Sequence, residues 1–216
     1  MRYALQVGTD VQAIIDNVYI GGGQGYPLNP DIPTSYFTPI EDLPDDMSWR
    51  WGYDPERAKQ MIIDAGYPDG LEMELCIDNT PESVDRGNML KEMWGKIGVD
   101  VTLKVVDTVA IRSLRGSGEF SDAIVIVTGN SNPEGHLEFW TQAPFAAQAR
   151  DEYLIEEVKK AVVIMDPIKR AAECKRLSLY RMEQLWNMGL GIRNLMHMNW
   201  PWVQNYYGES LSLIHI

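Results

Sequence analysis

Between residues 54 and 127, segments with helical periodicity alternate with short apolar segments of strand character, and this alternation constrains the fold most. Three predicted helices cover residues 54–66, 80–98 and 107–115, and a predicted strand follows each, over 71–77, 99–106 and 122–127. Helices that alternate with strands favour βαβ units, in which right-handed crossovers join parallel strands. The sequence therefore predicts an α/β fold with a mostly parallel sheet.

Local residues mark the ends of these segments. Asp54-Pro55 and Thr80-Pro81 each place a capping side chain before a proline at the first helical position, where the missing amide donor costs least. Apolar residues in the second helix recur at helical spacing, at Leu90, Met93, Trp94 and Ile97. Residues 71–77 instead alternate with a period of two, which is typical of a strand.

Further helices are predicted on both sides of this region. Residues 9–20 read as a helix that Thr9 or Asp10 caps. Two more helices follow the sheet, the second starting at Asp166-Pro167 and running to about Met188. The inward stripe of the first of these two comprises Leu154, Val158, Ala161, Val162 and Met165. Residues 24–53 are rich in proline and aromatic residues, so this segment either packs on the body or contacts a ligand.

Composition narrows the function classes. The 216 residues are 45% apolar and 23% charged, which is the usual balance of a globular protein, and this apolar share is enough for the core of one large domain. The net charge of −12 argues against nucleic acid as a partner and against anionic membrane surfaces. The amino terminus shows no signal-peptide core, which taken alone predicts a cytoplasmic protein.

The metal-binding residue types show no metal-site spacing. Cys76 and Cys174 are far apart in sequence, and they are read either as two buried small side chains or as one long-range disulfide. The three histidines lie in no zinc motif, so the sequence predicts neither a metal nor a cofactor.

The loop after the strand 122–127 is the candidate binding site, because parallel sheets bind ligands at the carboxyl ends of their strands. The residues assigned to ligand binding are Thr128, Gly129, Asn130, Ser131, Asn132 and Glu134, together with Trp140 downstream. An ordinary turn is the alternative interpretation, since these are also turn-forming residues. Glu134 and His136 are the acid–base pair of an alternative, enzymatic function. No other catalytic residues are identified.

Several stretches together resemble the bacterial family-5 solute-binding proteins, the dipeptide- and oligopeptide-binding type that serves ABC importers. Residues 2–16 are similar to the family's RxALxxAxDRxxI pattern, and 53–67 to its YDPEKAKxLLxEAGY pattern. The order continues with Ile97-Gly98-Val99, with the RxGxFD-like residues 115–122, with Asp166-Pro167 and with Pro201-Trp202-Val203-Gln204-Asn205-Tyr206. The match covers about the C-terminal half of a family member.

The resemblance implies an α/β, class II periplasmic-binding-protein lobe with a mixed, mostly parallel sheet and helices on both faces. It implies that residues 1–195 form the second lobe, and that 196–216 return through a hinge toward a first lobe and end in an unassigned tail. The implied function is capture of a polar solute between two lobes and delivery to ABC permease subunits, without catalysis. The implied location is periplasmic or extracellular, and a lipid-anchored full-length protein is one form that the resemblance allows.

The same resemblance implies where a peptide would be read. Peptide-binding members carry an aspartate for the peptide amino group at the position that falls near Gly129 or Asn130, and neither is acidic. A neutral loop cannot make that charge-assisted bond, so a neutral polyol or oligosaccharide fits it better. Glu134 as a displaced acid keeps a peptide solute open.

Overall fold

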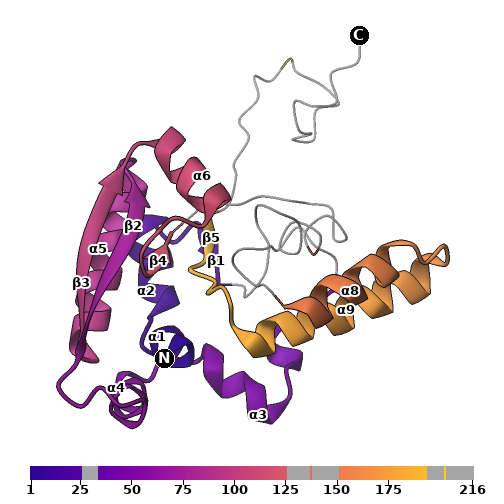
Figure 1. The fold of residues 1–216 in the computed structure, drawn as a ribbon, viewed down its shortest axis with the longest axis horizontal. Helices are drawn as coiled ribbons and strands as arrows, with labels where there is room; N and C mark the ends of the chain where they lie inside the picture. Colours follow the sequence, from indigo (N-terminus) through magenta and orange to yellow (C-terminus); the bar gives the residue numbers. More distant parts are fainter. Residues whose placement is uncertain (26–33, 126–136, 138–150, 194–201, 203–216) are drawn as a thin grey trace.

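The computed structural model describes residues 1–25, 34–125, 137, 151–193 and 202, and it shows an α/β body from which a two-helix arm extends (Figure 1). The body contains a sheet of β2 (Leu71–Asp78), β3 (Val99–Val106) and β4 (Ala123–Ile124), in the order β3–β2–β4. Both pairings in it are parallel. The predicted parallel sheet is confirmed, and the last two residues of the predicted strand 122–127 lie outside the described part.

Helices lie on both faces of this sheet. α5 (Pro81–Lys96) contributes Leu90, Met93 and Trp94 to the core cluster that also holds Leu75 and Ile77 of β2. α6 (Thr108–Ser117) links β3 to β4 and contacts β2. Since β3 and β4 flank β2 on opposite sides, right-handed crossovers place α5 and α6 on opposite faces.

Side-chain caps begin the helices, at the predicted places for α4 (Pro55–Asp64), α6 and α9 (Pro167–Gln184) and at an unpredicted one for α8 (Glu152–Val162). Asp54 Oδ1 accepts the Arg57 amide at 2.9 Å at the start of α4. Asp107, Asp151 and Asp166 cap α6, α8 and α9 in the same way. These short carboxylates satisfy amides that have no partner within the helix.

Asp10, not Thr9, caps α2 (Val11–Val18), because the Thr9 hydroxyl is used in the core. Asp10 Oδ1 accepts the Ala13 amide at 2.9 Å. Thr9 Oγ1 donates to the Leu5 carbonyl at 2.6 Å and accepts from Trp94 Nε1 at 2.9 Å. The turn between α1 (Arg2–Val7) and α2 is thereby tied to α5.

Two features of the body were not predicted from the sequence. α1 buries Ala4, Leu5, Gln6 and Val7 against neighbours that include α4, but its six residues are too few to show a period. β1 (Gly23–Gln24) and β5 (Ile192–Arg193) form a separate antiparallel pair. Two-residue strands so far apart in sequence leave no periodic signal.

From residue 34 onward, the proline- and aromatic-rich segment packs on α1 of the body and on α9. It forms η1 (Ile40–Asp42), α3 (Asp45–Ser48) and η2 (Trp49–Trp51). Phe37, Leu43 and Met47 are buried in one cluster with Met182 of α9. The packing interpretation is confirmed for this part, and contact with a ligand stays a prediction.

α8 and α9 form the arm, whose core contains Leu154 and Val158 from one helix and Leu177 from the other. Met165 does not belong to the inward stripe, as had been expected, because α8 ends at Val162 and the Met165 side chain is 90% exposed. α9 ends at Gln184, before the predicted Met188, where Leu185 takes a left-handed conformation. Cys76 and Cys174 are both buried and do not form a disulfide, so the disulfide interpretation is wrong.

Candidate ligand-binding site

The strand order creates a topological switch point between β2 and β4. The chain leaves β2 through α5 toward β3 on one side, and it returns through α6 to β4 on the other. Connections that diverge in this way leave a crevice at the carboxyl ends of the two strands, where open α/β sheets bind ligands. Asp78 and Asn79 at the end of β2 and Val125 after β4 occupy this edge, and the Val125 amide donates to the Cys76 carbonyl at 2.9 Å.

Asp78 organises the turn that leads from β2 into α5. Its Oδ1 accepts hydrogen bonds from the Thr80 amide, at 2.9 Å, and from the Thr80 hydroxyl. Thr80 Oγ1 in turn accepts the Ser83 amide at 3.4 Å and caps α5. The turn therefore holds the first residues of α5 at the carboxyl end of β2.

Arg86 completes a polar network at the same end of α5. Its side chain is 4% exposed. Nη1 donates to the Tyr19 hydroxyl at 2.9 Å and contacts Glu82 Oε1 at 3.5 Å, and Nη2 donates to Ser83 Oγ at 3.1 Å. Tyr19 follows α2, so the buried guanidinium connects two helices at this edge.

The network also sets the charge state of Asp78. Burial alone would raise the pKa of this carboxyl, but hydrogen bonds from Thr80 and Ser83 and the charge of Arg86 outweigh it, so the pKa lies below its usual value. Asp78 is therefore ionised at neutral pH. Asp78 and Glu82 outnumber the single guanidinium of Arg86, which leaves the edge net negative and favours hydrogen-bond donors.

This arrangement is suited to recognition and not to nucleophilic chemistry. Ser83 Oγ accepts a hydrogen bond from Arg86, and a guanidinium cannot take a proton from a serine at neutral pH. The Asp78 carboxyl, which Ser83 also contacts, is a weak base because its pKa is lowered. Within the described part of the chain, no group of three or more histidine, cysteine or acidic side chains could hold a metal ion.

The residues predicted from the sequence to bind ligand cannot be compared with this geometry. Thr128, Gly129, Asn130, Ser131, Asn132, Glu134 and Trp140, and also His136, lie outside the described residues. Sequence reasoning overlooked Asp78 and Arg86, and it identified Thr80 only as a helix cap. The signal was present, because Asp78-Asn79-Thr80 directly follow a predicted strand just as the chosen loop does. The burial of Arg86 had no such signal.

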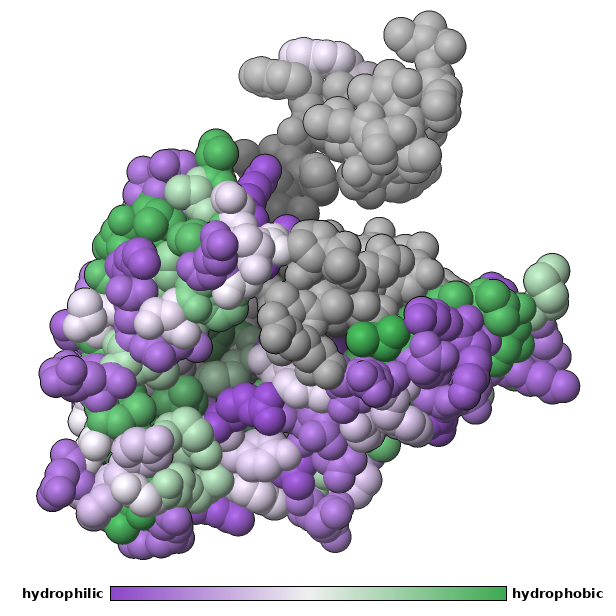
Figure 2. All heavy atoms as spheres, in the orientation of Figure 1, coloured by the Kyte–Doolittle hydropathy of each residue, from purple (hydrophilic) through white to green (hydrophobic). Residues whose placement is uncertain are grey.

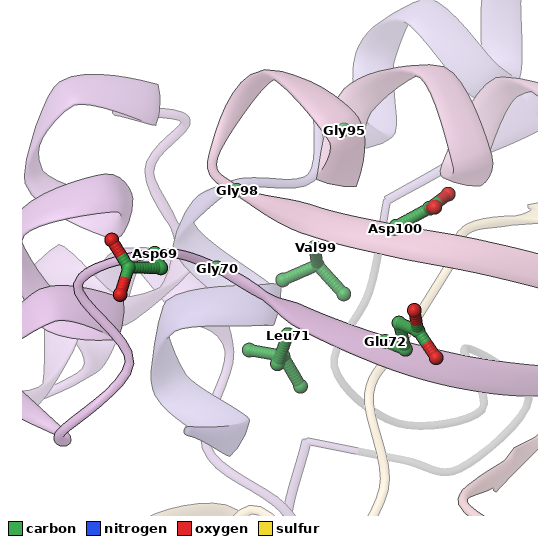
Figure 3. Close-up of a pocket in the computed structure, with 8 residues that line it drawn as sticks. All are labelled: Asp69, Gly70, Leu71, Glu72, Gly95, Gly98, Val99 and Asp100. Atoms are coloured by element: carbon green, nitrogen blue, oxygen red, sulfur yellow. The ribbon is translucent and has the colours of Figure 1, made fainter.

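A hollow of about 610 Å³ lies at the opposite, amino-terminal ends of β2 and β3 (Figure 3). Gly70 and Gly98 shape it, since both have positive φ and a Cβ on Gly70 would lie 2.5 Å from the Gly98 carbonyl oxygen. Figure 3 shows the Glu72 and Asp100 carboxylates on adjacent strands, where they pair in register. Because this hollow is remote from the switch point, we do not assign the solute to it.

The comparisons with known proteins agree on one protein family. The sequence profile described as "Bacterial extracellular solute-binding proteins, family 5 Middle" matches residues 1–144. Heme-binding protein A of Haemophilus influenzae is 33% identical over 145 residues, which are 63% of this chain and 25% of that protein. Di/tripeptide-binding protein 1 of Pseudomonas aeruginosa is 28% identical over 194 residues, or 85% of this chain and 34% of that protein.

A solved structure shows the same fold. HbpA2 from Haemophilus parasuis superposes with a TM-score of 0.74 at 24% identity, over 88% of this chain and 38% of that one. The chain thus spans about a quarter to a third of the length of the curated relatives named above. No helix in the described part of the chain is both long and apolar enough to cross a bilayer.

Proposed function

The chain belongs to family 5 of the bacterial extracellular solute-binding proteins, and on that basis we propose that it is part of the solute-binding component of an ABC uptake transporter. In this proposal the protein captures a polar solute between two lobes and delivers it to the permease subunits. Hinge closure around the solute needs no covalent chemistry. The family consists of binding proteins, which argues against the enzymatic alternative built on Glu134 and His136.

The polar network at the switch point is the observation that carries the proposal. Asp78, Thr80 and Arg86 lie at the edge where α/β sheets bind ligands, and Val125 leads from that edge into the loop that contains Thr128 to Glu134. We assign ligand contact to that loop and to Trp140, with Asp78 and Glu82 as additional acceptors.

We further propose that residues 1–195 form the second lobe and that 196–216 return toward a first lobe and end in a tail. The short span of the chain relative to its curated relatives supports this division. The family is extracellular, and we propose a periplasmic location, with lipid anchoring of the full-length protein as one form of it.

A short peptide is the solute class we favour, because a di/tripeptide-binding protein is among the relatives. The ammonium group of a peptide needs a carboxylate partner. The positions near Gly129 and Asn130 lack one, and Glu134 in the loop and Asp78 in the described network are the carboxylates we assign to this role.

Native mass spectrometry of the full-length protein, followed by calorimetry, tests the proposal. We expect a dipeptide to co-purify or bind, N-acetylation of that dipeptide to weaken binding, and Glu134→Gln to weaken the free dipeptide selectively. If the protein bound a neutral disaccharide and no dipeptide, the solute would be a sugar instead of a peptide, and the transport role would stand. Turnover of a bound solute that Glu134→Gln abolishes would overturn the role itself.

A further inference from the structure

The turn between α8 and α9 exposes three apolar side chains at the end of the arm. Val163 is 70% exposed, Met165 90% and Ile168 80%. Figure 2 shows hydrophobic residues gathered at this outer end of the arm. One exposed apolar side chain is ordinary, but three within six residues form a patch that a binding surface would explain. We call residues 163–168 the arm tip.

The backbone of the arm tip is largely satisfied from within. The Ile164 amide donates to the carbonyl of Ala161 at 3.1 Å, and the Ile164 carbonyl accepts from Arg170 Nη1 at 2.8 Å. Asp166 Oδ1 accepts the amides of Ile168, at 2.9 Å, and Lys169, at 3.2 Å. Paired backbone groups lower the cost of leaving water, so the tip is fit to enter an apolar interface.

Cations surround the arm tip, although the chain as a whole is acidic. Residues 159–170 contain four cationic side chains and one carboxylate, a local charge of +3 against −12 for the chain. Lys159 and Lys160 are 67% and 71% exposed, and their partners Glu156 and Glu157 lie farther from the tip. Long lysine side chains can follow an apolar surface while their charged ends reach its polar boundary.

Helix stability accounts for Lys159 and Lys160, which lie in the last turn of α8 where the helix dipole favours cations, but it does not account for the cations at the start of α9. Lys169 and Arg170 lie near the start of α9, where the positive end of the helix dipole disfavours cations, and the first turn of α9 contains no acidic residue. Arg170 has a structural role through the Ile164 carbonyl. Among the described residues no such contact explains the side chain of Lys169, which fits better as part of a surface that meets negative charge.

We propose that the arm tip inserts into the interface of an anionic lipid surface, with Lys159, Lys160 and Lys169 next to the headgroup phosphates. A convex apolar tip can enter a planar interface, as amphipathic membrane-binding segments do. The 11 residues of α8 span about 16 Å, which exceeds the Debye length of roughly 8 Å at physiological ionic strength. Salt therefore screens the acidic body from a surface that touches the tip, and the argument from net charge does not apply there.

Co-sedimentation of the chain with lipid vesicles tests this inference independently of any solute. We expect binding to vesicles of phosphatidylglycerol and phosphatidylcholine, little binding to phosphatidylcholine alone, and weakening by salt. The triple variant Val163→Ser/Met165→Ser/Ile168→Ser should partition roughly tenfold less. The matched control Ile20→Ser/Val109→Ser, at side chains 90% and 78% exposed elsewhere, should bind like the wild type.

Three results would overturn the inference: no binding of the wild type to anionic vesicles, equal binding by the triple variant, or equal loss in the control. Light scattering of the wild type and the triple variant measures self-association in parallel. A self-association that the triple variant abolishes, without any effect of vesicles, would assign the tip to a second copy of the chain instead. Thermal melts confirm folding, and Met165→Ser alone serves if the triple variant is unstable.

Discussion

Replacing Gly87 with alanine tests whether close packing of α5 on β2 holds the candidate site in place. Gly87 is buried on the face of α5 that meets the sheet. A Cβ at this position would lie 2.8 Å from Ile77 Cδ1 and 3.5 Å from Leu103 Cδ2. Arg86 and Ser83, on the same helix, are members of the polar network, so a shift of α5 would move them.

Two opposing effects set the magnitude. Alanine is a better helix former than glycine by roughly 0.5–1 kcal/mol in a helix interior. Overpacking a core costs about 1–3 kcal/mol, and the lower half applies because Ile77 Cδ1 is the mobile end of its side chain. We therefore expect Gly87→Ala to lower the free energy of unfolding by about 1 kcal/mol.

Gly95 in the same helix provides the matched control. It is exposed, and a Cβ there would meet no atom within 4 Å. Gly95→Ala keeps the gain in helix propensity without the overpacking, so it should stabilise the protein by about 0.5 kcal/mol. The two variants should then differ by about 1.5 kcal/mol.

Urea denaturation and thermal melting of both variants measure this difference. For a chain of this size, 1 kcal/mol corresponds to roughly 2–4 °C in the melting temperature, so the variants should melt about 3–6 °C apart. A Gly87→Ala protein as stable as Gly95→Ala would refute the close approach of α5 to β2, and with it the positioning of Arg86.

Three further predictions concern strain, charge and the sheet edge. Ile20 and Leu185 both have positive φ, 54° and 48°, but Ile20 is 90% exposed and Leu185 is 1% exposed. In urea titrations Ile20→Gly should therefore stabilise by up to about 1 kcal/mol and Leu185→Gly should destabilise by about 2 kcal/mol, and effects of equal sign would contradict this. Arg86→Gln should raise the pKa of Asp78 in an NMR titration, and an unchanged pKa would disprove the coupling. Ionised Asp78 stabilises the fold above pH 3.8, and this contribution is lost as the pH falls below that value. The variant should reduce this contribution. Asp122→Asn should speed hydrogen exchange of the β2 amide that Asp122 accepts at 2.7 Å, whereas unaltered protection would show that this bond does not hold β4.

One rule predicts from the sequence where the candidate site lies in the fold. Ligands meet the carboxyl ends of parallel strands, and this rule selects both the loop from Thr128 and the turn at Asp78. The composition of the sequence points only to the first, because that loop is rich in glycine and small polar residues. The contact between Arg86 and Tyr19 joins residues 67 positions apart, and no local pattern encodes it.

Features that depend on a few neighbouring residues could be predicted from the sequence alone. Caps such as Asp54 and Asp166 began their helices as predicted, and the two-residue period of β2 identified a strand, because these signals depend on neighbours within one turn or one pleat. Tertiary structure decided the rest. The helical fold of α1, the pairing of β1 with β5 and the burial of Arg86 depend on surfaces that distant segments supply, and Met165 is exposed because α8 turns into α9 before reaching it.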